Sequence, residues 1–141
     1  MTQKERKLLF VDLSARLPYE VYAETINELG ETNVNRISPD NIKFVSSGWF
    51  KECKPYLRPM SSMTEEEFEK LKEHSGLKYE QLDLASYQNG TYKCLDFYLS
   101  EVPSYVVILV FDWLNAHHFD YRSLIEKNLA IAVTEENNPY K

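Results

Sequence analysis

The chain has 141 residues, which is enough for one domain with its own buried core. It carries 22 acidic and 16 basic residues, a net charge of −6, and this balance argues against a protein that binds the phosphate backbone of nucleic acids. Cys53 and Cys94 have no CxxC spacing, so neither a disulfide framework nor a zinc ribbon is indicated, and we expect free thiols in a reducing compartment.

The hydropathy of the chain is that of a protein outside the membrane. The longest apolar run, Val106 to Phe111, is far shorter than the roughly 20 residues that a membrane-spanning helix needs. The polar residues 1–7 do not resemble the start of a signal peptide. We therefore predict a soluble, cytoplasmic protein with a single domain over residues 1–141 and a polar, frayed tail at about 134–141.

The first 17 residues have the pattern of an amphipathic helix. Leu9, Leu13 and Leu17 recur every four residues, which places them on one face. We expect charged residues, among them Asp12 and Arg16, to form the face in solvent. Because the residue before a proline disfavours helical angles, Pro18 is expected to end this helix.

The next part of the chain changes to the alternating pattern of strands. Residues 21–26 and 32–37 predict two strands joined by a turn, and the turn signal at 38–41 leads to a third predicted strand at 42–45. Together these strands would form an antiparallel meander. Because a small sheet needs a cover for its apolar face, we expect the first helix to pack on it.

Residues 54–62 (KPYLRPMSS) have no periodicity. Pro55 and Pro59 each restrict φ and remove an amide donor, so the sequence predicts a stiff, extended connector. Two interpretations stay open for this connector. Its apolar side chains pack on the domain, or the segment forms a recognition surface.

The clearest helix begins at Thr64. Thr64 and Glu67 have the spacing of a capping box, and Gly76 suits the left-handed residue that follows a helix. Phe68 and Leu71 give this helix a narrow apolar stripe, and its charged residues are expected to lie in solvent.

The second half of the chain predicts a hairpin followed by two helices. Asn89-Gly90 is a hairpin signal between residues 84–87 and 91–98. Apolar residues at helical spacing predict a helix over about 104–117, and a short helix is expected over 121–128. The complete set of elements predicts an α+β fold: a small antiparallel β-meander and a β-hairpin, packed with an N-terminal helix, a capped middle helix and a C-terminal helix-turn-helix corner.

The densest group of polar and aromatic residues is DWLNAHHFDYR at 112–122. One interpretation is a metal site, and its ligands would be Asp112, His117, His118 and Asp120. Adjacent histidines on a helix point in different directions, however, and this weakens the metal interpretation. The alternative is a structural corner in which Asp120 accepts amide hydrogen bonds and Arg122 binds a carboxylate or free backbone carbonyls. Three apolar residues would pack inward: Trp113, Phe119 and Leu124.

Three stretches of this chain together resemble one protein family. They are DLSARLPYEV (12–21), KPYLRPMSSMTEEE (54–67) and DWLNAHHFDYRSLIEKNLAI (112–131). The family consists of small uncharacterised proteins from gut Bacteroidetes and their phages or mobile elements. This chain departs from the family pattern at Ser14, where a cysteine is usual, and at Glu20 and Asn128, where glycines are usual. The resemblance implies no known activity and favours an accessory role in a mobile element.

These observations lead to the hypothesis of a non-enzymatic interaction module of phage or mobile-element origin. It would bind a host or phage protein and need no cofactor. Because Tyr and Arg often dominate interface energies, the candidate contact residues are Tyr56, Arg58, His117, Tyr121 and Arg122.

Two alternatives from other functional classes remain. One is a small metal-dependent hydrolase or nuclease that uses the four residues of the metal interpretation. The other is a nucleic-acid-binding accessory protein, although the acidic charge makes it the weaker alternative; its contacts would be Lys51, Lys54 and Arg58.

Overall fold

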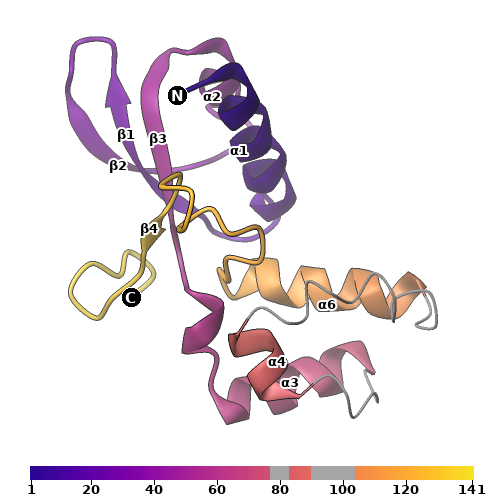
Figure 1. Ribbon diagram of the computed structural model, residues 1–141. Helices are drawn as coiled ribbons and strands as arrows, with labels where there is room; N and C mark the ends of the chain where they lie inside the picture. Colours follow the sequence, from indigo (N-terminus) through magenta and orange to yellow (C-terminus); the bar gives the residue numbers. More distant parts are fainter. Residues whose placement is uncertain (77–82, 90–103) are drawn as a thin grey trace. The chain divides into compact units, whose positions relative to one another are not determined.

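The computed structural model of the protein describes residues 1–76, 83–89 and 104–141 (Figure 1). The chain divides into two compact units, and each is described by itself. Met1–Arg58 and Asp120–Lys141 form the first, called here the sheet unit, and Pro59–Phe119 form the second, called the helical unit. The predicted α+β class is confirmed, because helices occur together with a mixed sheet. Among the described helices, none has both the length and the apolar character that a membrane crossing requires.

The sheet unit begins with the helix α1, Gln3–Arg16, at the predicted position. Thr2 and Glu5 form a capping box at its start, in which each side chain accepts a hydrogen bond from the other residue's backbone amide. One part of the prediction was wrong. Asp12 and Arg16 are fully buried rather than exposed, because they form an ion pair with each other inside the unit.

Strands β1 (Tyr22–Asn27) and β2 (Thr32–Arg36) form the predicted antiparallel hairpin. The predicted third strand at 42–45 was wrong, because these residues lie in or beside the short helix α2, Lys43–Ser47. The Asn41 side chain accepts from the Ser38 amide and donates to the Arg36 carbonyl, which closes a tight turn that leads directly into α2.

The third strand of the sheet is β3, Phe50–Leu57, which pairs antiparallel with β1. Half of the predicted connector is therefore an inner strand. The short strand β4, Ile131–Ala132, pairs parallel with its end, which gives the strand order β2-β1-β3-β4 over the described residues.

The position of Pro55 explains why a proline is tolerated in an inner strand. The Leu57 carbonyl accepts from the Val133 amide, so the backbone groups of Leu57 point to the β4 side. Backbone groups alternate in direction along a strand, so Pro55 faces that same side, one residue before β4 begins to pair at Tyr56. Its missing N–H therefore removes no bond of the sheet ladder.

The core of the sheet unit lies between α1, the sheet and the segment 124–130 (Figure 1). Leu9 and Leu13 of α1 pack with Ala23 of β1 and Cys53 of β3, and all four side chains are buried. The predicted cover of the sheet by the first helix is thus confirmed.

The C-terminal part of the sheet unit differs from the prediction. Residues 121–128 form consecutive turns instead of a helix, because Ser123 and Asn128 have positive φ angles of 59° and 58°. Nor is the end of the chain free, because Tyr140 is tied to the sheet. Its hydroxyl accepts from the Tyr22 amide and donates to the Tyr56 carbonyl, at the position where β1 and β3 would form their next pair.

The helical unit contains the predicted middle helix and the predicted helix before DWLN. These are α3 (Glu65–Ser75), with the capping box of Thr64 and the left-handed Gly76, and α6 (Ser104–Ala116). The 3-10 turn η1, Met60–Ser62, precedes α3.

The predicted strand at 84–87 was wrong. It is the short helix α4, Leu84–Gln88, because the Asp83 side chain accepts from the Ser86 amide and caps a helical turn. Residues 90–98, which hold the rest of the predicted hairpin, lie outside the described residues.

Candidate functional site

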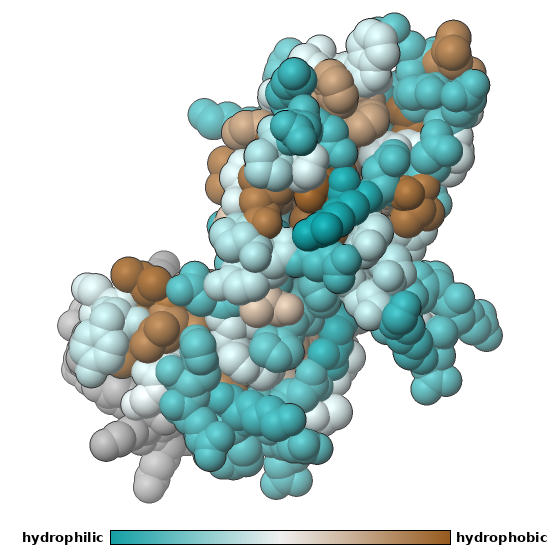
Figure 2. Space-filling view, turned by 180° about the vertical axis from the view of Figure 1, so that it is seen from behind, coloured by the Kyte–Doolittle hydropathy of each residue, from teal (hydrophilic) through white to brown (hydrophobic). Residues whose placement is uncertain are grey.

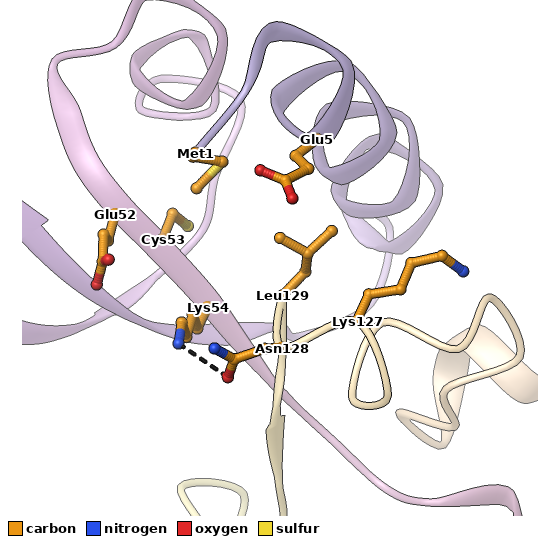
Figure 3. A pocket seen from close by; sticks show the side chains of 8 residues that line it. All are labelled: Met1, Glu5, Glu52, Cys53, Lys54, Lys127, Asn128 and Leu129. Atoms are coloured by element: carbon orange, nitrogen blue, oxygen red, sulfur yellow. Dashed lines mark hydrogen bonds between the residues drawn. The ribbon is translucent and has the colours of Figure 1, made fainter.

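A small pocket in the sheet unit lies beside the edge of β3 that faces away from β1 (Figure 3). Its volume is about 170 Å³. Three segments that are distant in the sequence contribute its lining: the start of α1, the middle of β3 and the turn before β4. The lining residues are Met1, Glu5, Glu52, Cys53, Lys54, Lys127, Asn128 and Leu129.

The pocket exists because β4 covers only part of β3. Strand β4 pairs with Tyr56 and Leu57, whereas β1 on the other side follows β3 back to Phe50. Asn128, which has a positive φ angle, lies in the turn just before β4. By the alternation along the strand, the backbone of Cys53 faces the same side as that of Leu57, which is the side of the pocket.

The base of the pocket is apolar. The side chains of Cys53 and Leu129 reach it from β3 and from the turn before β4, and both are buried. Burial raises the pKa of the Cys53 thiol to about 12, although the nearby Arg6 opposes this shift. Cys53 is therefore a neutral thiol at physiological pH and does not have the thiolate character of a nucleophile.

The rim of the pocket carries charges of both signs: Glu5, Glu52, Lys54 and Lys127. The Glu5 carboxylate accepts from the Thr2 amide at 2.7 Å, and this hydrogen bond lowers its pKa. Lys54 Nζ donates to Asn128 Oδ1 at 3.2 Å, the dashed line in Figure 3. These hydrogen bonds fix the Glu5 carboxylate and the Lys54 ammonium group at the rim. The other two charged side chains of the rim, Glu52 and Lys127, are exposed.

A second group of side chains in the sheet unit is called here the buried charge cluster. It combines the charged Asp12, Arg16 and Arg122 with the ring of Tyr121. Asp12 receives two hydrogen bonds from Arg16, at 2.8 and 3.1 Å, and one from Arg122, at 2.8 Å. The guanidinium carbons of Arg16 and Arg122 lie 5.3 and 4.7 Å from the ring centroid of Tyr121. The expected bond of Arg122 to a carboxylate is confirmed, and this bond gives Arg122 a structural task.

The other contact residues predicted in the sheet unit are Tyr56 and Arg58. Tyr56 is only 7% exposed, and burial raises the pKa of its hydroxyl. The Arg58 side chain is half-buried, and its carbonyl accepts from the Asp120 amide at 2.8 Å. Strand β3 carries Tyr56 into the packed interior, and a part of this residue in binding a partner stays a prediction.

His117 lies in the helical unit, on the turn that follows α6. Its ring stacks on Trp113 with centroids 4.0 Å apart, and its Nδ1 lies 2.8 Å from the Trp113 carbonyl. Trp113 in turn stacks on Phe119, and both are buried, as predicted for the corner.

The residues of the metal interpretation are divided between the two units: Asp112, His117 and His118 lie in the helical unit, and Asp120 lies in the sheet unit. Asp120 uses both carboxylate oxygens to accept the amides of Leu124 and Ile125, each at 2.9 Å, as the structural interpretation of the corner predicts. In the part of the chain that the structure describes, no three or more His, Cys, Asp or Glu side chains form a group able to hold a metal ion.

Comparison of the chain with protein-family models, with curated proteins and with solved structures found no match. The resemblance to the mobile-element family therefore stays a prediction. The pocket residues were missed by sequence reasoning because they come from three distant segments. The one available signal was Asn128, which suits a left-handed backbone.

Proposed function

We propose that the protein is a non-enzymatic interaction module that binds a host or phage protein, in keeping with an accessory role in a mobile element. Its partner would insert one apolar side chain into the β3 pocket. The observation that carries this proposal is the arrangement of the pocket, in which a buried apolar base is surrounded by a rim of both charges. Energetically important contacts in protein interfaces have this anatomy, because a surrounding polar rim excludes water from an apolar centre.

The size of the pocket favours a side chain over a small-molecule ligand. Ordinary ligand sites enclose roughly 300–1,000 Å³. The β3 pocket, at about 170 Å³, is well below this range. A single side chain of a partner, held in place by contacts outside the pocket, fits such a volume.

The chemistry of the lining residues supports binding rather than catalysis. Cys53 holds its proton, because burial raises the pKa of the thiol to about 12. The Glu5 carboxylate is occupied by the amide of Thr2, and Lys54 by the amide oxygen of Asn128. General acid–base catalysis needs a group whose pKa lies near the working pH, and the lowered pKa of Glu5 moves away from that range.

The hydropathy of the face seen in Figure 2 fits a small contact better than a large one. On the face seen in Figure 2, brown apolar side chains occur in small groups that are separated by teal polar side chains. A large apolar patch would indicate an extended hydrophobic interface. A binding site with a small apolar centre and a charged rim is consistent with this surface.

The test is capture of the partner by the purified protein from bacterial lysates prepared with and without phage infection. The informative variant exchanges two rim charges, Glu52→Lys with Lys127→Glu. Its matched control exchanges their exposed sequence neighbours, Lys51→Glu with Glu126→Lys, neither of which lines the pocket. Both variants keep the net charge at −6.

We expect the wild type and the control variant to capture the same protein in stoichiometric amount. The rim variant should capture at least tenfold less of this protein. Raising the salt concentration should weaken capture by the wild type, because exposed charges are screened. Equal capture by the rim variant would overturn the pocket as the contact. No stoichiometric partner in either lysate would overturn the proposal as a whole.

A further inference from the structure

The hydrogen-bond ladder between β1 and β3 has a gap directly beyond the pair of Ala23 with Pro55. The next pair of the same register would be Tyr22 with Tyr56. The Tyr22 amide and the Tyr56 carbonyl instead bond to the hydroxyl of Tyr140, at 3.1 and 2.8 Å. A direct bond of the ladder would bring N–H and C=O to about 2.9 Å from each other, whereas here an oxygen atom lies between them. This position is called here the β1–β3 gap.

The backbone groups of the β1–β3 gap select a hydroxyl. One donor and one acceptor point to the same oxygen atom, and a hydroxyl can accept one hydrogen bond while it donates another. A carboxylate lacks the donor, and an ammonium group lacks the acceptor. The rings add a second contact, because Tyr140 meets Tyr22 edge to face with centroids 5.7 Å apart. The gap therefore matches the phenol of a tyrosine.

The phenol in the gap keeps its proton. Burial raises the pKa of Tyr140 to about 12, so the hydroxyl remains a donor to the Tyr56 carbonyl at physiological pH. A phosphorylated tyrosine has no phenolic proton and carries about two negative charges. The gap should therefore exclude phosphotyrosine.

The segment 134–141, which brings Tyr140 to the gap, makes local hydrogen bonds (Figure 1). Thr134 and Asn137 each accept the other residue's amide, and Asn138 Oδ1 accepts the Tyr140 amide. Asn137 Nδ2 donates to the carbonyl of Ala132 in β4, which directly precedes the segment. Because these bonds do not depend on the gap, Tyr140 can leave it by local opening, without unfolding of the sheet.

Departure of Tyr140 also leaves the two backbone groups with a possible partner. A water molecule can bridge the same donor and acceptor, and such bridges are nearly as favourable in enthalpy as direct hydrogen bonds. The occupant of the gap is therefore exchangeable.

We propose that the β1–β3 gap is a binding site for the hydroxyl of a tyrosine, that Tyr140 fills it as an intramolecular ligand, and that a tyrosine-bearing segment of a partner protein competes with Tyr140 for it. Tyr140 then keeps the site closed until the partner is present. The apparent affinity for an external tyrosine is reduced in proportion to the fraction of molecules with an open gap. The site shares no lining residue with the β3 pocket, and it does not depend on the proposed function.

The test uses the full chain with Tyr140→Ala and the synthetic peptide TEENNPYK, which has the sequence of residues 134–141. The readout is the NMR resonance of the Tyr22 amide, which loses its bond to Tyr140 in this variant. We expect the peptide, at millimolar concentration, to return this resonance towards its wild-type position in a saturable manner. The wild type should bind the peptide at least tenfold more weakly, because Tyr140 occupies the gap.

The matched control is Tyr105→Ala, the same change at an exposed tyrosine of α6. It leaves Tyr140 in place, so it should bind the peptide as weakly as the wild type. Two altered peptides test the chemistry of the site. A peptide with Tyr140→Phe lacks the hydroxyl, and a peptide with phosphorylated Tyr140 lacks the proton. Both should bind the Tyr140→Ala variant at least tenfold more weakly than the original peptide.

Hydrogen exchange of the wild type provides a second measurement, which needs no variant. The Tyr22 amide should exchange through local opening, at a rate that low concentrations of denaturant do not change. The amides of Glu24 and Ile26, which lie further inside the paired part of β1, should exchange more slowly.

Three results would overturn the proposal: a folded Tyr140→Ala variant that does not respond to the peptide, equal binding of the phenylalanine peptide, or a Tyr22 amide that exchanges only on global unfolding. If Tyr140→Ala does not fold, the hydrogen exchange of the wild type decides. Adding Glu52→Lys with Lys127→Glu to the Tyr140→Ala variant should leave peptide binding unchanged, so failure of this proposal is distinguishable from failure of the β3 pocket.

Discussion

The buried charge cluster and the rim of the β3 pocket both combine acidic and basic side chains, but they place them in different surroundings. Asp12 and Arg16 have no exposed side-chain surface, and Arg122 is 26% exposed on its side chain. Glu52 and Lys127 at the rim of the pocket are exposed. Both groups belong to the sheet unit, so they can be compared directly.

The difference lies in what removal of one partner would leave behind. A charge in the interior has lost its hydration, so it needs its ion partner and its hydrogen bonds to remain there. A charge at the surface keeps most of its hydration, and its pairing contributes little to stability. We therefore interpret the buried cluster as the link between α1 and the 120–124 turn, whereas Glu52 and Lys127 at the rim keep their contact with solvent.

The largest effect is expected for Asp12→Ala. This change leaves the buried Arg16 guanidinium without its carboxylate, and it should lower the free energy of unfolding by about 3–5 kcal/mol. Chemical denaturation followed by circular dichroism measures the loss. The double change Asp12→Leu with Arg16→Met should recover most of it, since the fully buried pair is removed as a unit and the remaining Arg122, whose side chain is 26% exposed, can be hydrated. A stable single variant would show that water reaches the cluster.

A smaller loss is expected for Tyr140→Phe. The phenol hydroxyl joins the Tyr22 amide to the Tyr56 carbonyl, at 3.1 and 2.8 Å, and its removal leaves both groups without this partner. We expect a loss of about 1–3 kcal/mol in a thermal or urea denaturation. The matched control is Tyr22→Phe, whose hydroxyl bonds to the exposed Glu20, and this control should melt close to wild type. If Tyr140→Phe and Tyr22→Phe had the same melting temperature, the hydrogen bonds of Tyr140 would not contribute to the stability of the sheet.

Thr64→Ala tests whether a surface capping group matters as much as a buried one. Its hydroxyl accepts from the Glu67 amide at 3.2 Å at the start of α3. Loss of a cap of this kind costs about 1 kcal/mol. Thr64→Ser keeps the acceptor and should melt like the wild type. Differential scanning calorimetry can compare the melting temperatures of the two variants with that of the wild type. A Thr64→Ala variant with unchanged stability would mean that packing alone holds this helix end.

The smallest effect on stability is expected at the rim of the pocket. Glu52→Lys with Lys127→Glu should change the free energy of unfolding by less than about 0.5 kcal/mol, because both side chains are exposed. The same denaturation experiment as for Asp12→Ala provides the measurement. A loss comparable to that of Asp12→Ala would remove the distinction between the two groups of charges.

Local signals in the sequence were reliable where neighbouring residues decide the structure. The first helix, the hairpin of β1 and β2, the capped helix at Thr64 and the left-handed Gly76 all follow from interactions within a few residues. The helix over 104–117 followed from its apolar spacing.

The predictions from the sequence were wrong where contacts between residues distant in the sequence determine the structure. Pro55 argued against a strand, but its missing N–H lies on the β4 side of β3, one residue before β4 begins to pair. The charged pattern of α1 placed Asp12 in solvent, whereas Arg122, 110 residues later, helps to hold it inside. At 121–128 a short helix was expected, but two left-handed residues and the carboxylate of Asp120 stabilise turns.

The sequence by itself determined the α+β class, the ends of the two capped helices and the absence of any long apolar segment within these 141 residues. Each depends on composition or on hydrogen bonds between close neighbours, and such bonds can be read along the chain. Only the tertiary structure decided which strand edges stay open, which charges are buried and where the β3 pocket lies. These features depend on segments such as residues 1–5, 52–54 and 127–129 that meet in space, and a single sequence carries no information on distances between such segments.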